Sequence, residues 1–135
     1  MKKILVAFDG SEGSEQALSR AMILIEELGE LILLAVIPSP SEKKFLDKEM
    51  YKLLRKKAEN LIKNVISDLS LHNFTINGIV EDGDPAAVII DLANKLNVEL
   101  IVIGCKGTSE IGQYLIGSVA NKVVQYAHKP VMLVR

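Results

Sequence analysis

The chain has 135 residues, of which 49% are apolar and 24% are charged. This length and composition are typical of one globular domain that can bury a core, so we predict a single domain over residues 1–135. The formal net charge of −1 provides no broad basic field, so nucleic acid and anionic membranes are poor candidates for partners. One cysteine excludes an internal disulfide, and no apolar run is long enough for a signal peptide or a membrane helix, so we predict a cytoplasmic protein.

The chain begins with a pattern typical of a strand followed by a helix. Residues 3–8 (KILVAF) form a short aliphatic run that predicts a fully buried strand. Ser11 or Ser14 can cap the helix that follows. Apolar residues then recur at helical spacing as far as Leu28, so we expect Gly29 to end this helix.

The middle of the chain predicts a strand, a long helix and another strand. The aliphatic run 31–37 (LILLAVI) predicts a second buried strand, and two prolines after it forbid regular structure. A helix is expected from about 41 to 70, and the strand at 74–80 alternates enough to lie at a sheet edge. The basic run 52–60 is interpreted as the solvated face of that helix. Its other face is expected to be apolar and to comprise Leu53, Leu54, Ala58, Leu61, Ile62, Val65 and Leu69.

The last third repeats the alternation of helix and strand. Asp84 as N-cap and Pro85 at the first helical position predict a third helix, since proline there loses no helical hydrogen bond. The run 98–104 (VELIVIG) predicts a fourth strand. A helix at 118–127 and a short strand at 130–135 end the chain.

Buried strands that alternate with helices predict an α/β, Rossmann-like fold with helices on both faces of a parallel sheet. Five strands are expected in the order 3-2-1-4-5. The order then reverses between the first and fourth strands, and ligands bind beyond the carboxyl ends of such strands. Asp9 and Gly104 lie at those two ends.

Glycines are concentrated after the fourth strand. Gly104, Gly107, Gly117 and Ser118 have the spacing G-x2-G-x9-G-S. Glycine lets the backbone approach a ligand closely and take φ above zero. A helix that begins at Ser118 attracts anions to its free N–H groups. The pattern predicts a nucleotide site with phosphates at the helix N-terminus, although the same glycines can also serve only as turn residues.

Four stretches give the chain a specific resemblance along its whole length. They are KKILVAFDGSEGSEQAL, EDGDPAAVIIDLA, ELIVIGCKG and GSVANKVVQYAHKPVMLVR. The chain resembles the universal stress protein family, and the glycine pattern is similar to the ATP-binding signature of its nucleotide-binding branch. That resemblance implies binding of ATP with Mg²⁺ or Mn²⁺, usually as a dimer and without a well-defined catalytic role.

The resemblance also implies where a nucleotide would bind. Asp9 and the backbone near Val36 would contact adenine and ribose, glycines after the fourth strand would line the ribose and α-phosphate, and the start of the last helix would hold the outer phosphates. The implied cofactor-binding residues are Ala7, Phe8, Asp9, Val36, Gly104, Lys106, Gly107, Gly117, Ser118 and Val119. No catalytic residue and no metal ligand is assigned.

The chain departs from the family pattern near the glycines. Cys105 replaces a commoner serine, and Lys106 stands where arginine or histidine is frequent. The insert 108–116 has no basic residue but contains Glu110 and an extra glycine, Gly112. A carboxylate near phosphates repels them unless it points away or meets the metal.

Four further residues have side chains that can carry chemistry, and each has a structural interpretation beside a functional one. Asp9 is either a site acid or a residue of the turn that it begins. Cys105 is interpreted as an inert buried thiol rather than a redox group. His72 and His128 have no recognisable acid or nucleophile partner in the sequence and are interpreted as surface residues.

Three functions remain open at this point. The sequence favours a small ATP-binding regulatory protein that is at most a slow ATPase. The alternatives are a dimerising module that binds no nucleotide and, less favoured, an enzyme that cleaves ATP at the α-phosphate. Such enzymes use a glycine-rich loop after the first strand, and FDGSEGSE lacks consecutive glycines. A homodimer through the strand 130–135 is expected, because this strand is short, aliphatic and at an edge.

Overall fold

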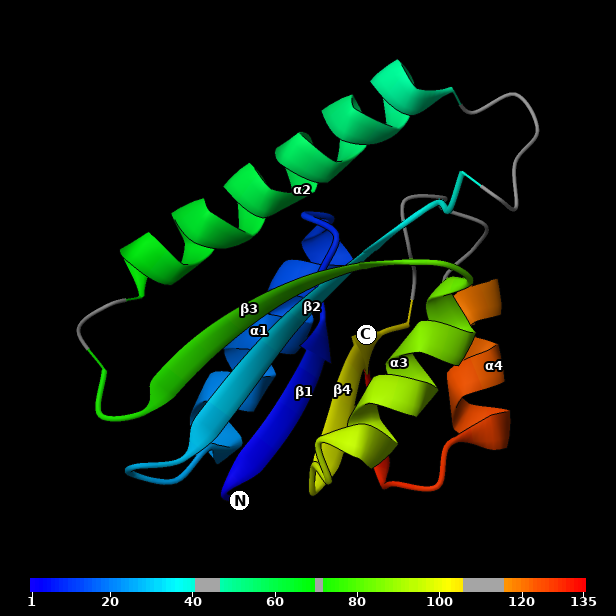
Figure 1. The fold of residues 1–135 in the computed structure, drawn as a ribbon. Coiled ribbons are helices and arrows are strands. Elements are labelled where there is room, and N and C mark those ends of the chain that lie inside the picture. Colours follow the sequence, from blue (N-terminus) through cyan, green and yellow to red (C-terminus); the bar gives the residue numbers. More distant parts are fainter. Residues whose placement is uncertain (41–46, 70–71, 106–115) are drawn as a thin grey trace.

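The computed structural model describes residues 1–40, 47–69, 72–105 and 116–135, and its five strands form one parallel sheet in the order β3-β2-β1-β4-β5 (Figure 1). The strands are β1 (Lys3–Ala7), β2 (Glu30–Ile37), β3 (Thr75–Asp82), β4 (Leu100–Gly104) and β5 (Val131–Val134). The helices are α1 (Glu12–Leu24), α2 (Lys48–Asp68), α3 (Pro85–Lys95) and α4 (Ser118–Tyr126). The predicted fold class and strand order are confirmed, and the strand bounds differ from prediction by two residues or fewer.

Side chains of the central strands alternate between two apolar layers. Leu31 and Leu33 of β2 join the cluster covered by α1 and α2. Ile32 and Leu34 join the cluster covered by α3 and α4. Helices therefore cover both faces of the sheet, as predicted, and the continuous aliphatic runs reflect strands buried on both faces (Figure 1).

Local capping chemistry starts α1 and α3 where the sequence predicted. The Ser14 N–H donates to Ser11 Oγ at 3.2 Å, so Ser11 is the N-cap of α1. The Ala87 N–H donates to Asp84 Oδ2 at 3.0 Å, and Pro85 begins α3. Both caps lie at the carboxyl end of the sheet.

The predicted end of the first helix is wrong. α1 ends at Leu24, and Leu28, expected on its buried face, is 92% exposed with a φ of 63°. The backbone leaves the helix because its N–H groups find partners far away in the chain. The Glu26 N–H donates to the Met1 carbonyl, and the Leu28 N–H donates to the Asn73 carbonyl, both at 2.8 Å.

The long helix is also shorter than predicted, and one residue of its predicted apolar face is exposed. α2 begins at Lys48, where the Met50 N–H donates to Asp47 Oδ1 at 2.7 Å, and residues 41–46 and 70 lie outside the described residues. Leu53 was expected on the apolar face but is 65% exposed. The rest of the predicted face is confirmed: Ala58 and Ile62 are buried against β3 and β2, and Leu54, Leu61, Val65 and Leu69 are half-buried.

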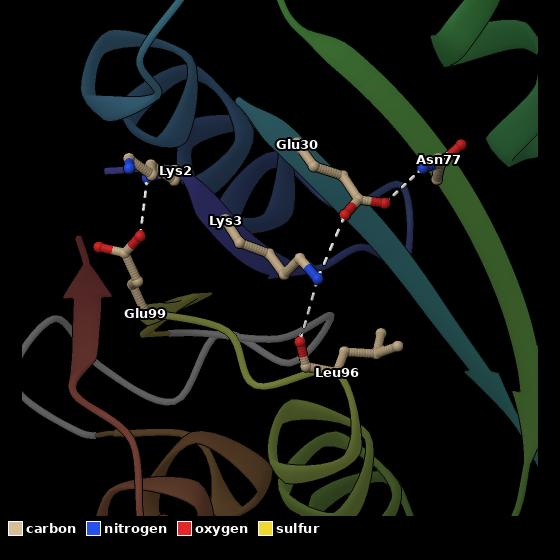
Figure 2. Close-up of polar contacts among 6 residues, drawn as sticks. All are labelled: Lys2, Lys3, Glu30, Asn77, Leu96 and Glu99. Atoms are coloured by element: carbon tan, nitrogen blue, oxygen red, sulfur yellow. Dashed lines mark hydrogen bonds and ion pairs between the residues drawn. The ribbon is translucent and has the colours of Figure 1, made fainter. Parts of the chain in front are cut away.

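Polar side chains join the amino ends of the strands (Figure 2). Lys3 Nζ lies 3.2 Å from the Leu96 carbonyl oxygen and 3.5 Å from Glu30 Oε1, and Asn77 donates to the other oxygen of Glu30. The Lys2 N–H donates to Glu99 at 3.0 Å. These groups satisfy one another, so this end of the sheet offers few free partners to a ligand.

In the part of the chain that the structure describes, no helix is long and apolar enough to cross a membrane.

Candidate functional site

A cavity of about 300 Å³ opens at the carboxyl ends of the strands, where the strand order reverses between β1 and β4. Eight of the ten residues predicted to bind a nucleotide line this cavity: Ala7, Phe8, Asp9, Val36, Gly104, Gly117, Ser118 and Val119. The other two, Lys106 and Gly107, lie outside the described residues, as does the insert apart from Ile116.

Other residues of the cavity were missed by the sequence reasoning. Leu34, Pro85 and Ile89 add an apolar wall from β2 and α3, and Ser11 and Ser14 add the first turn of α1. The sequence indicated part of this lining, because Ser11, Ser14 and Pro85 lie where predicted helices begin. Which of those helix starts meet at one cavity depends on the packing of α3 against the sheet.

The backbone of Val36 presents free polar groups to the cavity. The Phe8 N–H donates to the Leu34 carbonyl at 2.8 Å, and the alternation of a parallel strand turns the peptide groups of Val36 toward β1 as well. β1 has ended at Ala7, so the N–H and C=O of Val36 have no strand beside them. No described residue forms a hydrogen bond with either group. One donor and one acceptor therefore lie side by side at the edge of the cavity.

The N-terminus of α4 is the second free polar feature. In α1, α2 and α3 a side chain accepts a hydrogen bond from the first turn, and these caps are Ser11, Asp47 and Asp84. In α4 the N-cap is Gly117, no side chain among the described residues caps the helix, and its first turn has no acidic residue. The unpaired N–H groups and the positive end of the helix dipole therefore remain available to an anion.

The conformation of Gly117 corrects one expectation. Its φ is −60° and its ψ is 155°, values that any residue adopts, so a φ above zero does not explain this glycine. Its N–H donates to the Cys105 carbonyl at 2.7 Å, which ties the start of α4 to the end of β4. Positive φ values occur instead at Gly10 and Gly83, in the turns after β1 and β3.

Gly104 has a packing role that the sequence did not reveal. A Cβ atom at this position would lie 2.7 Å from the carbonyl oxygen of Gly13 and 2.8 Å from its carbonyl carbon. The expectation was that the missing side chain leaves room for a ligand. The missing side chain also allows the first turn of α1 to approach the end of β4, and Gly104 lines the cavity as well.

Asp9 is both a turn residue and a residue of the cavity, the two alternatives that the sequence left open. Its Oδ1 accepts the Ser11 N–H at 2.9 Å, as a turn residue does, and it also lines the cavity. It is the one charged side chain among the described residues of the lining. Cys105 lines the cavity too and is buried, whereas His72 and His128 are exposed, as expected.

Comparison with known protein families gives one match to the whole chain. The model of the Universal stress protein family matches residues 1–135. Universal stress protein YxiE of Bacillus subtilis is 32% identical over 146 residues, and the match covers 98% of each chain.

Solved structures with similar sequences have the same fold as this chain. Universal stress protein MJ0577 of Methanocaldococcus jannaschii has a structure that is 30% identical to this chain, with a TM-score of 0.88 over 98% of this chain and 94% of that one. A universal stress protein solved in complex with cAMP is 25% identical, with a TM-score of 0.66 over 99% and 96% of the two chains.

Proposed function

Because the chain belongs to the universal stress protein family, we propose that it is a small regulatory protein that binds ATP in the cavity between β1 and β4. The observation that carries the proposal is the uncapped N-terminus of α4 at the cavity. A family member in complex with cAMP supports a nucleotide as the ligand. A cytoplasmic location is part of the same proposal.

The free groups of the cavity suit the parts of an adenine nucleotide. The N–H groups at Ser118 and Val119 and the Ser118 hydroxyl would hold phosphate oxygens. The N–H and C=O of Val36 match the acceptor N1 and the donor N6 of adenine. Leu34 and Ile89 provide apolar surface for the base, and Asp9 would accept a ribose hydroxyl.

The described residues also fit Mg²⁺ or Mn²⁺ that arrives with the phosphates. They contain no group of three or more His, Cys, Asp or Glu side chains that could hold a metal ion. Mg²⁺ usually binds through substrate phosphates, water and one or two carboxylates. Phosphate oxygens and water would supply most of the ligands of the metal, so the cavity needs no cluster of metal-ligating side chains. The metal, when bound, would neutralise phosphate charge.

The turn after β1 argues against cleavage of ATP at the α-phosphate. Such a reaction would use the N-terminus of α1, but Ser11 already caps that helix and Glu12 and Glu15 lie in its first turn. Their negative charge disfavours a phosphate there. Asp9 is the one side chain of the described lining that could act as a base, and its Oδ1 already accepts the Ser11 N–H. We therefore propose hydrolysis that is slow at most.

Titration with nucleotides tests the proposed function. We expect saturable heat on addition of ATP with Mg²⁺ in calorimetry, weaker binding of GTP, and unhydrolysed ATP released from denatured protein after purification. AMP or pyrophosphate in that release would favour the enzyme. If neither assay finds nucleotide, the chain is a module with an empty cavity and the proposal is wrong.

We further propose that two copies pair through β5. The Ile101 N–H donates to the Pro130 carbonyl and the Cys105 N–H donates to the Val134 carbonyl, so alternation turns the peptide groups of Val131 and Leu133 away from β4. α4, which contacts β5, exposes Val124 and Tyr126. An aliphatic edge with free peptide groups favours strand pairing.

Met132→Lys is expected to weaken this dimer, because it places a charge on a half-buried apolar edge strand. Light scattering at micromolar protein should show a dimer for the parent and a larger monomer fraction for the variant. Leu53→Lys, at an exposed apolar position of α2, is the matched control and should remain dimeric. A monomeric parent would contradict the prediction.

A further inference from the structure

No residue of α2 lines the cavity between β1 and β4, so the proposed nucleotide site gives the charges of this helix no role. This helix carries six lysine or arginine residues and three acidic residues, in a chain whose net charge is −1. It packs on β2 and β3, on the opposite face of the sheet from α3 and α4 (Figure 1). The positive charge of the molecule is therefore concentrated beside the edge strand β3.

The outer edge of β3 has peptide groups that pair with no described strand. The Thr75 N–H donates to the Gly29 carbonyl and the Gly83 N–H donates to the Ile37 carbonyl, so the odd-numbered residues of β3 pair with β2. The peptide groups of Ile76, Gly78 and Val80 consequently point away from the sheet. No further strand lies beyond β3 among the described residues.

A groove of about 390 Å³ lies between this edge and α2. Its strand side is formed by Gly78 and Val80, two of the residues whose peptide groups point outward. Ile62 and Ile66 form an apolar surface on the helix side. A Cβ at Gly78 would collide with Ile62 Cγ2, so the helix lies directly against the strand at this point.

Two cations, Arg55 and Lys63, and one carboxylate, Glu59, line the same groove. Arg55 Nη2 donates to the outward carbonyl of Val80 at 3.4 Å, Nη1 donates to Tyr51 Oη at 3.1 Å, and Nε lies 3.7 Å from Glu59 Oε1. The hydrogen bond with Tyr51 raises the pKa of Arg55, so the guanidinium stays charged. Lys63 has no ion pair or hydrogen bond with any described residue, and its charge is free for a partner.

We propose that the groove between α2 and β3 binds an extended acidic peptide segment of a partner protein, which adds to β3 as a further strand. Main-chain hydrogen bonds to Gly78 and Val80 hold the segment, and its carboxylates meet Lys63 and Arg55. An N–H group of the bound segment replaces Arg55 as the donor to the Val80 carbonyl, where the Arg55 contact is long. The guanidinium then becomes available to a carboxylate of the segment. Alternating free donors and acceptors along a strand edge favour a peptide over nucleic acid or a membrane surface.

The test uses the full chain and a fluorescein-labelled peptide of eight residues in which valine and glutamate alternate. Fluorescence anisotropy should show saturable binding that weakens with added salt. The same peptide with N-methyl groups on alternate residues keeps its charge but loses donors. The methylated peptide should not bind measurably.

Two charge reversals on α2 test the position of the site. Lys63→Glu, in the groove, should weaken binding of the unmethylated peptide by about tenfold. Lys57→Glu, exposed on the same helix outside the groove, is the matched control and should change affinity by less than about twofold.

Three outcomes would overturn the proposal. They are no saturable binding at millimolar peptide, equal binding of the methylated peptide, and equal effects of the two reversals. Duplex DNA that binds as tightly as the peptide, with the same dependence on Lys63, would assign α2 to polyanions in general. None of these outcomes bears on the nucleotide cavity.

Discussion

Gly117→Asp is expected to abolish nucleotide binding and to leave the protein as stable as its parent. The backbone of Gly117 already has the conformation of an ordinary N-cap residue, with φ of −60° and ψ of 155°. An aspartate there would accept the free N–H groups of α4, as Asp84 does in α3. Stability should change by only a few tenths of a kcal/mol, since glycine is itself a tolerated N-cap.

The affinity should respond much more strongly than the stability. The new carboxylate would occupy the place of a phosphate oxygen and repel the remaining phosphates. Each lost hydrogen bond to a charged group costs about 1.5–3 kcal/mol, so the loss of two predicts a decrease in affinity of at least about a hundredfold. Calorimetric titration with ATP measures the affinity, and thermal unfolding measures the stability.

Gly117→Asn is the matched control because it caps α4 without a charge. It should bind ATP more weakly than the parent but clearly better than the aspartate variant, and the difference reports the charge. Ser118→Ala should lose about ten- to a hundredfold in affinity, because one hydroxyl donor is removed while the helix N–H groups remain. If the aspartate variant is folded and binds ATP like the parent, α4 does not hold the phosphates.

Gly104→Ala is expected to lower the free energy of unfolding by about 3 kcal/mol, at the upper end of overpacking effects. The new methyl group would meet the carbonyl of Gly13 at 2.7 Å, and that carbonyl belongs to the first turn of α1. Backbone cannot move aside as a flexible side chain can. α1 would have to shift away from β4, and the cavity beside Ser14 would change with it. Urea unfolding measures the effect.

A second glycine tests the same kind of packing against a side chain. A Cβ at Gly78 would collide with Cγ2 of Ile62, a β-branched methyl group that can move only if the side chain rotates or α2 shifts. Gly78→Ala should therefore also destabilise the protein, and combining it with Ile62→Ala should cost less than the sum of the two single changes. Equal stability of Gly104→Ala and its parent would show that α1 adjusts freely, against the packing role given to Gly104.

Much of the fold follows from signals carried by neighbouring residues. The short β-branched and aliphatic run KILVAF favours a buried strand, and Asp84 followed by Pro85 starts a helix by local hydrogen bonding. Alternation of these elements, with right-handed crossovers, led to the strand order and hence to the cavity beside Asp9 and Gly104. The sequence also determined that a glycine and not a capping side chain precedes α4.

Tertiary structure decided what depends on partners far away in the chain. α1 stops at Leu24 because the N–H groups beyond it bond to Met1 and Asn73, which no local pattern reveals. The free peptide groups of Val36 exist because β2 runs past the end of β1. Gly104 is needed because the backbone of Gly13 arrives beside it. Local propensity determines where elements form, whereas their ends, their free polar groups and their closest contacts depend on how the assembled elements meet.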